Sequence, residues 1–393
     1  LVDINWPLEE IASDQFQIAG GWGGGTFVGS VGVTLNNLSI KNFFKKGAWR
    51  PYPMGQNQRL SISAQTNGTY YKAFAISFTD PWMGGRKPNS FTISAHYSDE
   101  NNAYYAWQKC TRYFRTAGVA AGLGKRLDWP DPYFTFYAEA SYERYMLKDW
   151  NTFVLKNGAA NLLSIRLVLG RNSVDQPIYP RRGSDFSVSV QLTPPYSLWD
   201  GKDYKSTALS EQERYNWIEF HKWMLKGQWF TPLTRNGNLV LMARAEMGYL
   251  GHYNKNKVSP FERFEVGGDG MTGYNMYGID IISMRGYDDG ALDPVGSNYS
   301  CAYNKYTMEL RYPLLLKGQT NIYVLGFLEG GNGFTSWKEF SPFKIKRSAG
   351  IGVRLFLPVV GMVGVDWGWG FDPAAGQTKR SGSHIHFTMG MQF

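Results

Sequence analysis

The amino-acid sequence predicts an all-β protein, a single 16-stranded antiparallel transmembrane β-barrel of the outer-membrane type. Composition is the first observation behind this prediction. Aromatic residues make up 16% of the 393 residues and 45 residues are glycine, a mixture that favours strands and tight turns over a helical bundle. The second observation is a regular alternation of apolar and polar side chains in many segments of about ten residues, the length at which a tilted strand crosses a bilayer.

The alternation is clearest at the C-terminus. One face of the strand expected over 383–393 is apolar and is formed by Ile385, Phe387, Met389, Met391 and Phe393. The other face is polar and carries His384 and His386. Trp367 and Trp369 alternate with small or polar residues in the same way. Because each strand of a membrane barrel turns one face to lipid, we expect these tryptophans and the apolar face of 383–393 to meet lipid or the headgroup boundary.

Alternation alone would also suit a soluble β-sandwich, so the number of segments and their connections decide between the two folds. The expected strands are 14–23, 25–36, 58–67, 69–79, 90–99, 111–126, 131–147, 157–175, 184–195, 214–230, 238–251, 304–314, 319–330, 346–357, 360–371 and 382–393. Sixteen is an even number, and short connections alternate with long ones, of which the longest runs from about 252 to 304. No helix of useful length and no interdomain linker is expected. We therefore predict one barrel over 14–393, preceded by a linker, 1–13, from a periplasmic region outside this chain.

Charge and cysteine content exclude several classes of function. The net charge of +9 is spread over the chain without a run of five or six Lys and Arg, so a nucleic-acid partner is not expected and anionic lipid headgroups fit at least as well. Cys110 and Cys301 are too few for a disulfide framework.

The sequence offers no catalytic motif. H-E-x-x-H, C-x-x-C, G-x-S-x-G and the P-loop are all missing from it, so neither an enzyme nor a cofactor is expected. Gly268 to Gly273 match G-x-G-x-x-G but lack the strand-to-helix context, which favours a glycine-rich turn over dinucleotide binding. His384 and His386 could share a metal ion, but no further ligand cluster accompanies them, so a role in lining the lumen is preferred.

The most informative motif lies inside the longest connection and reads Met284-Arg285-Gly286-Tyr287. On its own it would suit an exposed turn. Other stretches accompany it in a fixed order, namely Phe78-Thr79-Asp80-Pro81-Trp82, Met308-Glu309-Leu310-Arg311-Tyr312-Pro313, Phe327-Leu328-Glu329-Gly330-Gly331-Asn332, Arg347-Ser348-Ala349-Gly350-Ile351-Gly352 and the terminal Phe393. Together they resemble the BamA family of outer-membrane protein assembly factors. Its sixth extracellular loop carries Val/Ile-Arg-Gly-Phe/Tyr, and Met284 replaces the β-branched residue of that motif.

The resemblance implies a bacterial outer-membrane protein that folds and inserts other β-barrels without covalent chemistry. Its implied partners are unfolded outer-membrane β-barrel clients, outer-membrane lipid and lipopolysaccharide, and accessory assembly proteins or lipoproteins. A secretion transporter of the same superfamily and a passive porin remain alternatives. A porin would share the composition and strand count without needing the Arg-Gly-Tyr loop.

Two sites follow from this resemblance and from the strand parity. Arg285 is expected to fold back into the lumen and to pair with Glu309 and Glu329. Glu309 shares its parity with other polar residues and should face inward, whereas Glu329 shares its side with Tyr323 and Phe327.

The second predicted site is a lateral gate between the first and last strands. An incomplete sheet of a client protein leaves N–H and C=O groups unpaired in lipid, at a cost of several kcal/mol each. A barrel that opens between its first and last strands could pair with the edge of that sheet. Gly20 and Gly21 supply no side chains for cross-strand packing and so weaken the first strand, whereas Gly23 to Gly25 fit a weak seam and a hairpin turn equally. The predicted gate comprises Phe16, Ile18, Gly20, Gly21, Ile385, Phe387, Met389 and Phe393.

Overall fold

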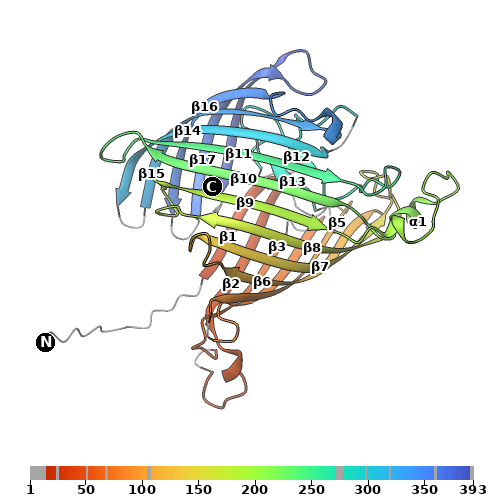
Figure 1. Cartoon of the computed structure of the whole chain (residues 1–393), viewed down its shortest axis with the longest axis horizontal. Coiled ribbons are helices and arrows are strands. Elements are labelled where there is room, and N and C mark those ends of the chain that lie inside the picture. Colours follow the sequence, from red (N-terminus) through yellow and green to blue (C-terminus); the bar gives the residue numbers. More distant parts are fainter. Residues whose placement is uncertain are drawn as a thin grey trace.

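A computed structural model describes residues 15–23, 26–49, 52–66, 70–85, 87–103, 108–270, 278–296, 299–317, 320–357 and 361–389. Sixteen strands form one antiparallel sheet, in which each strand pairs with the next along the chain and β11 pairs with β14. Figure 1 shows this sheet curled around a central space. The predicted sixteen-stranded antiparallel architecture is therefore confirmed. Within the described ranges, no helix is both long and apolar enough to cross a bilayer.

The strands of the large sheet are β1 (Gln15–Gly23), β2 (Thr26–Leu38), β3 (Gln58–Thr66), β4 (Tyr71–Asp80), β5 (Asn89–Asn101), β6 (Tyr113–Arg126), β7 (Phe134–Lys148), β8 (Gly158–Asn172), β9 (Gly183–Leu192), β10 (His221–Pro232), β11 (Val240–Gly251), β14 (Ala302–Lys317), β15 (Thr320–Phe334), β16 (Lys346–Leu357), β17 (Gly361–Pro373) and β18 (Arg380–Met389). The short strands β12 (Phe264–Val266) and β13 (Asp280–Ile282) pair with each other in parallel. The remaining elements are the helix α1 (Glu211–Tyr215) and the 3-10 turns η1 (Ile40–Asn42), η2 (Tyr196–Leu198) and η3 (Trp337–Glu339).

One strand prediction is wrong at its start. The strand expected over 214–230 begins only at His221, and α1 occupies residues before it. The reason is a capping box, in which Ser210 Oγ accepts a hydrogen bond from Glu213 N and the Glu213 carboxylate accepts one from Ser210 N. Ser-x-x-Glu is the sequence signature of such a helix start, and the apolar residues that follow it concealed the signal.

The outer face of the sheet is apolar, as expected for a lipid-facing surface. Trp367 and Trp369 are 46% and 39% exposed, and Ile385 and Phe387 are 65% and 57% exposed. The same outward face continues around the sheet in residues such as Val31, Ile62, Phe74, Ile93, Val119, Ile165, Leu225, Met308 and Val353. The Met389 side chain and the whole of Phe393 lie outside the described residues.

The connection of residues 252–301 is called loop 6 below; its described part carries β12 and β13 and enters the lumen. Its Phe261 stacks on Tyr145 of β7 with ring centroids 4.4 Å apart and also contacts Phe114 of β6. All three side chains are essentially inaccessible to water. Loop 6 is therefore packed inside the sheet as a hydrophobic core would be.

A second connection enters the lumen from the opposite end. Tyr179, between β8 and β9, is buried in a cluster with inward-facing residues such as Phe230 and Tyr323. Its hydroxyl lies 2.9 Å from Asn238 O and 3.1 Å from Arg311 O, so that its one proton is shared between two backbone carbonyls. Cys110 is exposed and Cys301 is buried, and both are free thiols.

Candidate functional site: loop 6 on the inner wall of β14–β18

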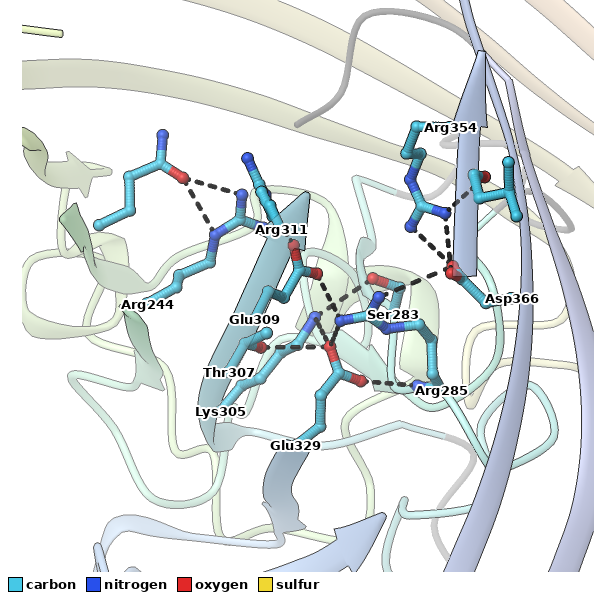
Figure 2. A network of polar contacts seen from close by, with 12 residues as sticks. Arg244, Ser283, Arg285, Lys305, Thr307, Glu309, Arg311, Glu329, Arg354 and Asp366 are labelled. Atoms are coloured by element: carbon cyan, nitrogen blue, oxygen red, sulfur yellow. Dashed lines mark hydrogen bonds and ion pairs between the residues drawn. The ribbon is translucent and has the colours of Figure 1, made fainter. Parts of the chain in front are cut away.

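Arg285 lies at the centre of the site and contacts both carboxylates that the sequence grouped with it. Its Nη2 atom is 2.7 Å from Glu309 Oε1 of β14 and 2.7 Å from Glu329 Oε1 of β15. The backbone N–H of Arg285 donates to the second oxygen of Glu329 at 2.9 Å. Figure 2 shows the guanidinium directed between these carboxylates. Loop 6 is thus held to two adjacent strands by charge-assisted hydrogen bonds.

Four further charged residues, absent from the sequence-based prediction, extend this ion-pair network (Figure 2). They are Lys305, Arg311, Arg354 and Asp366. Arg311 lies 2.7 Å from the second Glu309 oxygen. Asp366 of β17 pairs with Arg354 at 2.7 Å and lies 3.7 Å from Arg285. All of these residues are buried, so the charges depend on one another for compensation.

The glycine of the motif, Gly286, packs directly against the inner wall of the barrel. Gly286 has φ +85°, and a Cβ atom there would lie 2.9 Å from both Gly370 N and Ser348 Cβ. A Cβ on Gly368 of β17 would in turn lie 2.7 Å from Gly286 N. The inward glycines of β17, which alternate with outward tryptophans, therefore allow the loop backbone to approach the wall closely.

The motif is also bound to the last strand, β18. Gly286 N donates to His386 Nε2 at 2.8 Å, and His384 Nδ1 lies 3.2 Å from an Asp288 carboxylate oxygen. Tyr287 Oη donates to the backbone carbonyl of Arg347 on β16 at 2.8 Å. Both histidines therefore face the lumen and contact loop 6. No candidate metal cluster of His, Cys, Asp or Glu occurs among the described residues.

Met284 occupies a buried position that suits its apolar side chain. It is fully buried in the cluster that fills the lumen, and its backbone N–H donates to Gly268 O at 2.8 Å. Gly268 has φ +75° and follows β12. The described part of the Gly268–Gly273 stretch therefore belongs to the internal packing of loop 6.

Loop 6 has a second set of buried charges away from Arg285. Lys222 of β10 lies 3.0 Å from Glu262 and 2.8 Å from Asp280. Burial raises the pKa of the Glu262 carboxyl to about 7. Burial likewise raises the pKa of Asp293 to about 8, although Ser300 donates a hydrogen bond to it.

The predicted gate strands occupy the two ends of the sheet order. The register places Gly20 opposite Gly29 and Gly21 opposite Val28, so both glycines lie within β1 and not in its turn. β1 ends at Gly23, and residues 24 and 25 lie outside the described ranges. Phe16 and Ile18 also lie in β1, where only their backbone is described.

The other predicted edge is β18, whose partner is β17. Ile385 lies opposite Trp367, Phe387 opposite Val365, and Met389 opposite Val363. Within the described residues the sheet order begins at β1 and ends at β18, and no register joins these two strands. The structure thus brings loop 6 to one of the two predicted gate strands, β18, through the histidines of that strand.

Comparison with known proteins places the chain in a family. Residues 54–393 match the model of the Omp85 superfamily domain. The chain belongs to the Omp85 superfamily. It is 23% identical over 332 residues to the outer membrane protein assembly factor BamA of Neisseria meningitidis serogroup B, a match that covers 79% of this chain and 34% of that protein. The chain therefore spans about a third of the length of this curated relative.

Solved structures of two kinds share the fold. BamA from Haemophilus ducreyi lacking POTRA domains 1–3 aligns with a TM-score of 0.64 at 17% identity, covering 95% of this chain and 68% of that chain. CdiB from Escherichia coli aligns with a TM-score of 0.58 at 13% identity, covering 97% of this chain and 63% of that chain. These similarities establish an outer-membrane β-barrel fold of the Omp85 type.

Proposed function

We propose that this Omp85 barrel assembles and inserts β-barrel proteins into the bacterial outer membrane through a lateral gate between β1 and β18. The observation that carries the proposal is the hydrogen bond from Gly286 of loop 6 to His386 of β18. It connects the buried ion-pair network directly to one edge of the proposed gate. With β18 held from inside, β1 can part from it and offer its backbone groups to a client strand by β-augmentation.

The two sides of the proposed gate differ in how firmly they are held. β18 is bound to loop 6 from the lumen and packs Ile385 beside Trp367 on its neighbour. β1 instead pairs Gly20 with Gly29, a position without side-chain packing. Parting β1 from β18 would therefore move the β1 side, and the exposed β1 edge would offer hydrogen bonds to the terminal strand of a client, a strand that alternates and ends in Phe.

The orientation follows from the alternation of the connections. Loop 6 and most of the other long connections, such as residues 193–220, would face the cell exterior, whereas the 39–57 connection would lie at the periplasmic end, where β1 begins. Residues 1–13 would then be the linker to a periplasmic region. Unfolded β-barrel clients, accessory assembly proteins or lipoproteins, and outer-membrane lipid and lipopolysaccharide are the proposed partners. Insertion of this kind requires no cofactor and no covalent chemistry.

The position of loop 6 inside the lumen favours the assembly proposal over its two alternatives. A secretion transporter or a passive porin needs an open path through the barrel, whereas loop 6 packs its aromatic residues against β6 and β7 and its charges against β14, β15 and β17. Either activity would require loop 6 to leave this position, at the cost of separating Arg285 from its carboxylates.

A disulfide across the seam tests the gate. Cysteine pairs introduced along β1 and β18, with Cys110 and Cys301 changed to serine, should stop insertion of a client barrel in proteoliposomes, and reduction should restore it. The matched control is Val365→Cys with Phe387→Cys, a pair in register across β17 and β18. This control should leave insertion intact because it links strands that the mechanism keeps together.

The opposite result would contradict the lateral gate. If an oxidised seam pair inserts clients as fast as the reduced protein, the seam does not open during assembly. Transport through the lumen, with loop 6 displaced, would then become the better explanation of the fold.

A further inference from the structure

The connection of residues 39–57, between β2 and β3, exposes an unusual amount of apolar surface. Phe44 is 92% exposed and Trp49 is 53% exposed, and Ile40 and Phe43 are 48% and 43% exposed. Figure 1 shows this segment projecting beyond the strand ends, away from the sheet. Exposed aromatic residues gathered in one connection indicate a surface that something else covers.

The exposed rings are held by an ordered framework. Phe43 contacts Phe44 and Trp49 edge to face, with ring centroids 5.4 and 5.0 Å apart, and Trp49 Nε1 donates to Phe43 O. Ser39 N donates to Pro53 O, and its hydroxyl donates to the Gln56 side chain. The connection is therefore ordered, at a cost in conformational entropy, and its aromatic rings nevertheless remain exposed to solvent.

The charge of this connection is entirely positive. Residues 39–57 contain Lys41, Lys45, Lys46 and Arg50 and no Asp or Glu. The three lysines are exposed, and in the described part of the chain no carboxylate forms an ion pair with them. Aromatic residues beside several lysines are the composition of an interfacial membrane anchor, because rings enter the acyl boundary while ammonium groups meet phosphate.

The position of the connection relative to the lipid-facing surface fits the same role. Leu35 of β2 lies opposite Leu60 of β3, and the next outward residues toward the barrel centre, such as Ile62, are exposed. Ile40 follows Leu35 by five residues, a span of at most about 18 Å. The aromatic residues therefore lie within reach of the headgroup region at the end of the barrel opposite loop 6. Trp82, in the next connection at this end, is also exposed.

We propose that the 39–57 connection binds the headgroups of anionic glycerophospholipids in the inner leaflet, with its rings inserted at the acyl boundary. The assignment to the inner leaflet rests on the orientation proposed above. Since the connection follows directly from β2, which pairs with β1, bound lipid would tether the weaker side of the seam to the membrane.

The test uses the full chain in nanodiscs. A Cys110→Ser, Cys301→Ser, Phe44→Cys protein labelled with an environment-sensitive fluorophore should be shielded from iodide in discs of phosphatidylcholine with phosphatidylglycerol, and quenched there by headgroup-labelled lipid. Changing Lys41, Lys45 and Lys46 to Gln should remove this dependence on phosphatidylglycerol. The control label replaces Asn236, an exposed residue at the same end, and should stay open to iodide in every lipid.

A second measurement keeps Phe44 in place. Native mass spectrometry of the unlabelled protein should find phosphatidylglycerol retained by the wild type and lost from the triple Gln variant, with affinity reduced about fivefold for each lysine removed. Iodide access at residue 44 equal to that at residue 236 would overturn the proposal. So would shielding that is the same with and without phosphatidylglycerol, which would mean that the connection does not recognise anionic headgroups. Neither readout involves client insertion, so the lateral gate can fail while this result stands.

Discussion

The wall formed by β14–β17 and the wall formed by β3–β5 share the same alternation of inward and outward residues. They differ in the side chains on their inner surfaces and in whether loop 6 covers them. On β14–β17 the inward residues include charged side chains beside the glycines of β16 and β17, and loop 6 covers them so that Glu309, Glu329 and Asp366 are buried. On β3–β5 the inward residues are small or polar, such as Ser63 and Ala75, and they border a cavity of about 170 Å³. Alternation therefore sets which residues face inward, while the loop that covers them decides whether they contribute to stability.

The largest expected difference between the walls is the loss of one charged partner. Arg285→Ala should lower the free energy of unfolding by about 3–5 kcal/mol, because it leaves buried carboxylates without compensation. His96→Ala on the open wall should cost less than about 1 kcal/mol, since its contact with Glu143 is half exposed to water. Urea unfolding of the detergent-folded barrel, followed by tryptophan fluorescence, measures both. Equal losses would show that the two walls are equally important for stability.

A smaller loss of stability should come from disturbing the close contact between Gly286 and the barrel wall. Gly286 and Gly382 have nearly the same φ, +85° and +84°, but a Cβ would collide with the β16–β17 wall only at Gly286. Gly382→Ala should therefore cost about 1–2 kcal/mol for its backbone conformation alone, and Gly286→Ala about 1–3 kcal/mol more for overpacking. The same unfolding measurement gives the difference. A similar cost for both variants would mean that loop 6 can move away from the wall easily.

The third prediction is a change of loop 6 packing with pH. Because the pKa of Asp293 is raised to about 8 in the folded state from 3.8, the folded protein keeps a proton that the unfolded chain releases. The stability that this proton contributes is fully present below about pH 4 and is lost progressively as pH rises to the folded pKa of about 8. Proteolysis of loop 6 should therefore speed up as pH rises from about 4 to 8 and change little above pH 8. Asp293→Asn should remove the change between pH 7 and 8 and leave a smaller change below pH 7 that Glu262 causes.

The control for the pH effect is the open wall. Backbone amides of β4 should keep the same hydrogen-exchange protection across this pH range, since Asp293 and Glu262 lie in loop 6. Loss of protection in both regions would mean that the whole barrel loosens with pH.

The fold could be predicted from sequence because each strand repeats a period of two. The pattern predicted sixteen strands because apolar residues such as Ile351 and Val353 alternate with glycine and arginine on opposite faces. It failed at 214–220, where α1 is stabilised by a local hydrogen-bonded cap and not by burial. A signal of three or four residues is easily lost beside a longer apolar pattern.

The site was predictable only where a motif marked it. The motif led to Arg285, and strand parity led to Glu309. Glu329 was harder to place because Phe327 shares its face, and the structure shows that this inner face is itself partly apolar where loop 6 and Tyr179 cover it. Asp366 carried no signal beyond its parity, since its role depends on where a distant loop comes to lie.

The contacts of Arg285 have a consequence for the order in which the barrel folds. Glu309 and Glu329 follow Arg285 by only 24 and 44 residues, and Asp366 also lies C-terminal to it. Closing such loops costs less entropy than joining β1 to β18 across the length of the chain. The C-terminal strands can therefore assemble around loop 6 as an open half-shell, onto which the earlier strands close last. A loop enclosed in this way never has to be threaded into a finished ring.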